Sequence, residues 1–176
     1  MATDISLTLQ LSSPQLQQIA KGNTATFQAQ SFSWGADNTI TIGSGTAGVG
    51  AGKAKFAEAS FTKVADSVAS ALLFQLLVTG EHLGTVTIEV RKAGTPGPGP
   101  STPEAMVTIT LSTVFVTHFG QSVSGSDEGL QEVFNLAYGA AQMTINAVDP
   151  TGKITTGTPT MWNQVTNTST PSIPGN

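Results

Sequence analysis

The sequence predicts a mainly β protein, folded as a barrel or a sandwich, with one α-helix. Apolar and polar residues alternate with a period of two in several segments, such as 5–11 and 86–90, which is typical of strands that bury one face. Only one segment, 67–79, shows a convincing helical pattern. Stretches rich in Gly, Pro and Ser separate these elements, and many short strands with long exposed loops favour a barrel or a sandwich.

The N-terminal part is expected to consist of two strands joined by a loop. A polar loop is predicted over 12–23, because Pro14 interrupts regular structure there. A second strand is predicted over 26–34. Alternation along it would place Phe32 on one face of the sheet and Phe27 on the other.

The predicted helix has a start signal, a stop signal and apolar residues on more than one side. Asp66 or Ser67 can cap its N-terminus, and Gly80 suits the left-handed position that follows a helix. We expect the helix to be buried on two sides, against its own sheet and against a neighbour. Its apolar residues are Val68, Leu72, Leu73, Phe74, Leu76 and Leu77.

The rest of the chain is predicted to be strands and loops. A flexible segment is expected over 43–52, which is almost wholly Gly, Ala, Ser and Thr, and an elongated hairpin loop over 94–103. The last two strands should form an antiparallel pair that turns at Gly139, followed by a loose Ser/Thr/Pro-rich tail over 168–176. The remaining strands are expected at 53–61, 86–90, 106–119, 130–138 and 140–148.

Composition limits the kind of surface the protein has. Charged residues make up 10% of the 176 residues, whereas about a quarter is typical of soluble domains. Such a neutral surface is expected where other subunits cover it, although a plain β-domain with a Thr/Ser-rich face would show the same composition. The net charge is −4 without a basic cluster, so we expect no nucleic-acid binding. The chain has no cysteine, and we expect neither a secretory signal at its start nor a segment that spans a membrane.

No pattern in the sequence supports catalysis, a cofactor or a metal. Residues 43–48 match GxGxxG, but strand-like sequence follows instead of the helix that a dinucleotide site requires. The two histidines, His82 and His118, have no metal-binding or catalytic spacing to carboxylates. Glu132 and the acidic residues 127–128 are expected to form a small patch that keeps a loop soluble. We therefore expect no catalytic, cofactor-binding or metal site.

A set of short motifs carries a resemblance to a known family. In chain order they are a Ser-Trp-Gly strand end, a Gly-Ala-Gly-Lys loop, a Phe-Thr-Lys segment before the helix and an Arg-Lys-Ala-Gly turn. With this order and spacing the sequence resembles the haemolysin-coregulated protein (Hcp) family, the tube subunits of type VI secretion systems. The residues that carry the resemblance include Trp34, Gly35, Phe61, Thr62, Lys63, Arg91 and Lys92.

The resemblance implies an antiparallel β-barrel of two sheets with one flanking α-helix and an extended Gly-rich loop, over residues 1–167. It also implies hexameric rings that stack into a hollow tube. Partners would be further copies of the chain, sheath protein, spike protein and small effectors, with assembly in the bacterial cytoplasm and secretion without a signal peptide. The expected ring-stacking loop contains Gly43, Gly45, Gly48, Gly50, Gly52 and Lys53, and the expected ring interface contains Leu73, Phe74 and Leu77.

Two departures from the family pattern leave other functions open. The acidic segment usual after the first strand is replaced by Leu11-Ser12-Ser13-Pro14, and the loop over 95–103 is unusually rich in Pro and Gly. The alternatives are a tube of a related contractile injection apparatus, a monomeric ligand-binding β-barrel and a subunit of a free-standing extracellular filament.

Overall fold

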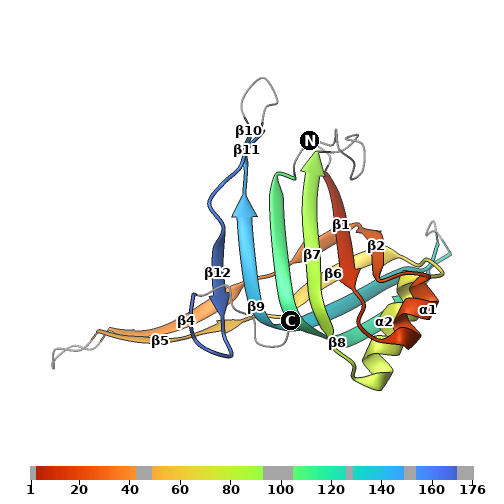
Figure 1. Ribbon diagram of the computed structural model, residues 1–176, viewed down its shortest axis with the longest axis horizontal. Helices are drawn as coiled ribbons and strands as arrows, with labels where there is room; N and C mark the ends of the chain where they lie inside the picture. Colours follow the sequence, from red (N-terminus) through yellow and green to blue (C-terminus); the bar gives the residue numbers. More distant parts are fainter. Residues whose placement is uncertain (1–2, 43–48, 93–104, 126–128, 149–153, 170–176) are drawn as a thin grey trace.

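Antiparallel strands dominate the structure, a computed structural model that describes residues 3–42, 49–92, 105–125, 129–148 and 154–169 (Figure 1). The main sheet has the order β2-β1-β7-β8-β9-β6-β3, and β12 also pairs with β9. Its strands are β1 (Thr3–Gln10), β2 (Thr24–Ala29), β3 (Ser31–Ser33), β6 (Ala59–Val64), β7 (Leu83–Lys92), β8 (Val107–Ser122), β9 (Gln131–Ile145) and β12 (Thr160–Asn163).

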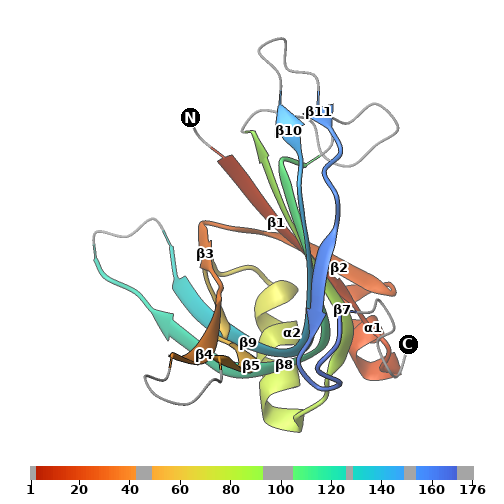
Figure 2. The same ribbon diagram turned by 90° about the vertical axis from the view of Figure 1, so that its left-hand side faces the viewer.

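Two small sheets and two helices complete the described fold. Strand β4 (Ala36–Ile42) pairs with β5 (Val49–Phe56), and β10 (Ala147–Val148) pairs with β11 (Ile154–Thr155). Helices α1 (Pro14–Ala20) and α2 (Ala69–Thr79) lie together at one end of the main sheet, whereas the β4–β5 hairpin projects from the opposite end (Figure 1). The sheet is strongly curved (Figure 2).

The mainly β, antiparallel fold is confirmed: eight strands form one curled main sheet, accompanied by two two-stranded sheets, where the resemblance implies a barrel of two sheets. The two ends of the strand path, β2 and β3, are consecutive in the chain and are joined through Gln30, whose backbone N–H donates to the Thr62 carbonyl at 2.8 Å. Within the described residues, β2 and β3 do not pair with each other, and only the chain at Gln30 connects them. Hydrogen bonds between strands therefore do not close the main sheet into a barrel.

The interruption at Gln30 also corrects the predicted directions of two aromatic side chains. Phe27 and Phe32 both contact the core: Phe27 lies 6.1 Å from Phe134 and Phe32 lies 6.0 Å from Phe61, measured between ring centroids. The prediction of opposite faces is wrong because it assumed an unbroken strand. Phe61 and Phe134 stack on each other at 4.9 Å, so these four rings form one aromatic cluster inside the sheet.

The predicted helix is confirmed as α2. The Asp66 carboxylate accepts hydrogen bonds from the backbone N–H groups of Val68 and Ala69, and Gly80 adopts the left-handed conformation with φ 69°. A helix follows the first strand where a loop was predicted, because Pro14 occupies the first turn of α1. The missing N–H of proline costs nothing there, and Leu16 buries its side chain in the core.

The turn predicted at Gly139 is also wrong, since β9 runs through this residue as one strand paired with β8. Glycine has another effect there: a Cβ on Gly139 would lie 3.2 Å from the Val165 side chain, a tight contact, and 3.5 Å from that of Thr113. Gly139 thus allows the C-terminal segment to approach β9 closely. The predicted loop over 94–103 and most of the predicted tail lie outside the described residues.

Candidate assembly surfaces

The β4–β5 hairpin is the first candidate assembly surface. Its strands pair from Ala36 with Phe56 to Ile42 with Val49, with an irregularity between Asn38 and Ile40. The resemblance implies an extended Gly-rich loop in this part of the chain, whereas the described residues form a paired hairpin that reaches away from the main sheet (Figure 1). An exposed pair of strands joined by a Gly-rich connection suits contact with another molecule.

Some of the predicted stacking residues lie within this hairpin, and the others belong to 43–48. Gly50 and Gly52 lie within β5, and Lys53 follows them on the same strand with an exposed side chain. Gly43, Gly45 and Gly48 lie outside the described residues. Their role in stacking stays a prediction.

The base of the hairpin is held by contacts that no sequence pattern predicted. Phe56, the last residue of β5, has its ring 5.1 Å from that of Tyr138 on β9. The side chain of Gln164 accepts a hydrogen bond from the Phe56 N–H at 3.2 Å and donates one to the Tyr138 carbonyl at 2.7 Å. Since Gln164 lies 108 residues from Phe56 along the chain, no local pattern could have indicated this contact.

The outer side of α2 is the second candidate surface. Val68, Ala71, Phe74 and Val78 are exposed and recur at spacings of three and four, so they share one apolar stripe. Phe74 is 54% exposed, and its ring lies 6.3 Å from that of Phe119, measured between ring centroids. An exposed apolar stripe on a helix whose other side is already buried is typical of a protein contact.

The predicted ring-interface residues occupy different environments on α2. Leu73 is fully buried in the core of its own chain, so it is not available to a neighbouring subunit, and its assignment to the ring interface is corrected. Leu77 is partly buried and packs against the same core. Phe74 is therefore the predicted residue that a neighbour could contact most extensively.

The Phe-Thr-Lys motif on β6 has a structural role within the chain. Lys63 is 1% exposed and its Nζ lies 2.8 Å from Oε2 of Glu132, which is completely buried on β9. Ser70 donates to the same oxygen at 2.8 Å, and Gln121 donates to the other carboxylate oxygen at 2.7 Å. This buried ion pair joins β6, β8, β9 and α2. It also corrects the interpretation of Glu132 as a solubilising surface charge.

Lys63 also reaches the start of α2. Its Nζ lies 2.9 Å from Oδ2 of Asp66, three residues further along the chain. Partial burial opposes ionisation of Asp66, but the hydrogen bond from Lys63 and those from the Ala69 and Val68 backbones together hold its pKa below the usual 3.8. The charged carboxylate is therefore favoured where it caps the helix.

The other motif residues mark packing positions and a turn. Trp34 packs against the core, and Gly35 follows it as the chain enters β4, its carbonyl accepting a hydrogen bond from the Ala57 N–H at 2.9 Å. Phe61 lies in the aromatic cluster, and the Thr62 hydroxyl bonds that of Ser31 at 2.6 Å. At the end of β7, Arg91 pairs with Glu89 at 2.9 Å, and Lys92 pairs in register with Thr3.

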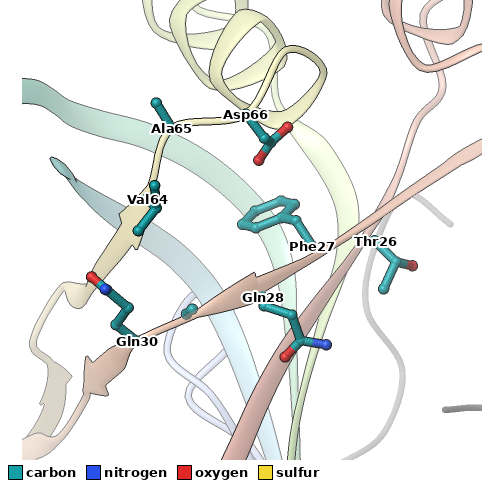
Figure 3. Close-up of a pocket in the computed structure, with 8 residues that line it drawn as sticks. Thr26, Phe27, Gln28, Gln30, Val64, Ala65 and Asp66 are labelled. Carbon is teal, nitrogen blue, oxygen red and sulfur yellow. The ribbon is translucent and has the colours of Figure 1, made fainter. Parts of the chain in front are cut away.

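A surface hollow of about 470 Å³ lies between β2 and the connection from β6 to α2 (Figure 3). It is lined by 26–30 and 64–66, with Phe27 directed towards Asp66. The hollow is open and holds no cluster of titratable groups beyond Asp66. The alternative of a ligand-binding barrel could use this open hollow or a smaller one of about 180 Å³, which is lined by 31–33, 60–62 and Val133.

Within the described ranges, no group of three or more His, Asp or Glu side chains is placed to hold a metal ion. None of the helices described is long and apolar enough to cross a membrane. The arrangement consists of a packed core, a projecting hairpin and an apolar helix face. It defines a mainly β structural protein whose distinctive surfaces suit contact with other protein chains.

Comparison with known proteins identifies the family. The family model described as type VI secretion system effector, Hcp, matches residues 12–145, so the chain belongs to the Hcp family. The predicted resemblance is confirmed, and the chain is a tube-forming structural protein of type VI secretion. No curated protein sequence matches the chain.

Solved structures share the fold. A type six secretion system protein has a TM-score of 0.74 at 24% identity, with 95% of this chain and 99% of that chain covered. Hcp1 from Salmonella typhimurium has a TM-score of 0.64 at 20% identity, covering 97% and 100%. A chain of the anti-feeding prophage baseplate has a TM-score of 0.53 at 14% identity, covering 80% and 91%.

Proposed function

We propose that six copies of this chain close into a ring and that the rings stack into a hollow tube through the β4–β5 hairpin. The observation that carries this proposal is the hairpin itself, whose described strands pair only with each other. An isolated two-stranded hairpin is marginally stable in water. A second surface that covers the projecting strands would stabilise them, and the next ring in a stack supplies such a surface.

The ring contact is assigned to the outer side of α2 together with neighbouring sheet edges. A closed ring requires head-to-tail interfaces, in which a patch on one subunit meets a different patch on the next. The apolar stripe that contains Phe74 and Val78 provides one such patch. Obligate interfaces of this kind commonly bury more than about 2,000 Å² and are apolar at their centre.

The finer assignments follow from this tube. Sheath protein would surround it, spike protein would sit at its tip, and small effectors would travel in its lumen. Assembly would take place in the bacterial cytoplasm, and the tube would then be secreted without a signal peptide. Residues 1–167 would form the tube domain, with 168–176 as a tail. A role of this kind requires binding surfaces and no catalytic group.

Native mass spectrometry tests the ring. The purified chain is expected at six times its 18.0 kDa mass. A monomer at all concentrations would contradict the proposal and favour the ligand-binding alternative.

Shortening the hairpin tests the stack. Deleting Gly43 to Gly52 is expected to leave folded rings that do not form tubes. A gentler variant replaces 41–50 by Asn-Gly, a two-residue turn that suits the pair Ile40–Ala51 at the shortened end. Electron microscopy and size-exclusion chromatography distinguish rings from tubes, and normal tubes from both variants would disprove the role of the hairpin.

A further inference from the structure

We propose that the turn after β12 is a clamp that fixes the direction in which the β4–β5 hairpin leaves the body, with Gln164 as its positioning residue. The inference rests on the proposed function, since the direction of the hairpin matters only if the hairpin contacts another ring. The clamp is defined as 163–168, which begins at the last residue of β12 that pairs with β9.

The Gln164 carboxamide connects two elements that do not pair directly in the sheet. Its oxygen accepts the Phe56 N–H at 3.2 Å, at the last residue of β5. Its nitrogen donates to the Tyr138 carbonyl on β9 at 2.7 Å, and the Gln164 backbone N–H donates to the Gly139 carbonyl at 3.0 Å. One residue therefore ties the base of the hairpin to the longest strand pair of the sheet.

The clamp is itself rigidly held. Asn163 is 2% exposed, and its side-chain oxygen accepts the N–H groups of Val165 and Thr166 at 2.9 and 3.1 Å. The backbones of Asn163 and Thr168 exchange a further pair of hydrogen bonds, at 2.9 and 3.2 Å. Gly139 lacks the Cβ that would press on Val165, so the turn sits directly on β9. A side chain carried by such a turn has little freedom to follow a moving hairpin.

Geometry explains why this small contact affects assembly. Strand β5 has eight residues, which at about 3.3 Å per residue make an arm of about 26 Å. A swing of about 10° at the base would move the far end by about 4–5 Å, roughly the spacing between neighbouring strands. An error of that size misaligns the hairpin with any surface built to receive it. The clamp therefore pre-organises the hairpin for docking.

The test uses the full chain and two variants of the same residue. Gln164→Met keeps the length of the side chain and removes both side-chain hydrogen bonds. Gln164→Glu keeps an acceptor for the Phe56 N–H but removes the donor to Tyr138 at neutral pH. Gln18→Met, at an exposed position on α1, is the matched control. Hydrogen exchange of peptides covering 49–56 reports the hairpin, and peptides from β7 and β8 report the core.

The expected result is faster exchange in 49–56, by about tenfold or more in Gln164→Met and by less in Gln164→Glu, with the core unchanged. The control should match the wild type. Electron microscopy should show rings but few tubes for Gln164→Met.

Two outcomes overturn the proposal. One is hairpin exchange in Gln164→Met equal to that of the wild type. The other is faster exchange with tubes as abundant as in the wild type, which would show that the direction of the hairpin does not limit stacking. Failure of the wild type itself to stack would instead disprove the proposed function, while the exchange data would still decide whether Gln164 holds the hairpin.

Discussion

Replacing Lys63 by methionine tests whether the family's Phe-Thr-Lys motif stabilises the fold. Methionine keeps much of the length of the lysine side chain but removes the ammonium group that lies 2.8 Å from Glu132 and 2.9 Å from Asp66. Glu132, which is completely buried, would keep only the hydrogen bonds from Ser70 and Gln121. A buried carboxylate would then remain without a counter-charge.

The size of the effect follows from this burial. Removing one partner of a buried ion pair costs about 3–5 kcal/mol of unfolding free energy, whereas an exposed pair contributes about 1 kcal/mol or less. With a urea dependence of about 2 kcal/mol per molar, the unfolding midpoint should fall by about 2 M. Unfolding is followed by circular dichroism at one fixed subunit concentration, because assembly itself adds to apparent stability.

A second variant separates the buried charge from the lost contacts. Combining Lys63→Met with Glu132→Leu removes both charges, and well-packed apolar replacements of a buried pair are often neutral or stabilising. The double variant should therefore recover most of the loss. A cost below about 1 kcal/mol for Lys63→Met alone, or a double variant no more stable than the single one, would refute the argument that Glu132 depends on Lys63.

Two further predictions concern the helix surface and the base of the hairpin. Phe74→Glu places a charge on the exposed stripe of α2, so it should abolish ring formation while the thermal midpoint stays within a few degrees of the wild type. Gln18→Glu, at an exposed position on α1, is the control. Intact rings from Phe74→Glu would exclude this stripe from the interface. Burial raises the pKa of Tyr138, the only tyrosine, to about 12, so its tyrosinate absorbance should appear near pH 12 in the folded protein and near pH 10 when it is unfolded. Because its pKa is higher in the folded state, Tyr138 stabilises the fold below about pH 10, and this contribution is lost as the pH rises to about 12. Ionisation of Tyr138 near pH 10 in the folded protein would contradict the burial of its hydroxyl.

Local patterns predicted those elements whose residues are close in sequence. The period-two alternation of β1 and β7 and the signals at both ends of α2 depend on residues only a few positions apart. Asp66 and Gly80 were correctly assigned to the helix ends for the same reason. The short motifs also identified the family, since their order along the chain is itself a property of the sequence.

Patterns that have two physical explanations were interpreted wrongly. Proline interrupts a helix but also suits its first turn, so Pro14 predicted a loop where α1 begins. Glycine permits turns but also close approach of another segment, so Gly139 predicted a turn inside the continuous strand β9. In both cases the deciding contact, the burial of Leu16 or the approach of Val165, comes from the folded chain.

The sequence by itself therefore determined the mainly β class, helix α2 and membership of the Hcp family. Only the tertiary structure decided that Lys63 meets Glu132, 69 residues away, and that Gln164 meets Phe56, 108 residues away. It also separated Leu73 in the core from Phe74 on the surface of the same helix. The physical reason is that alternation, capping and turn propensity act over a few residues, whereas burial and the pairing of a polar group depend on which distant segments the curled sheet brings together.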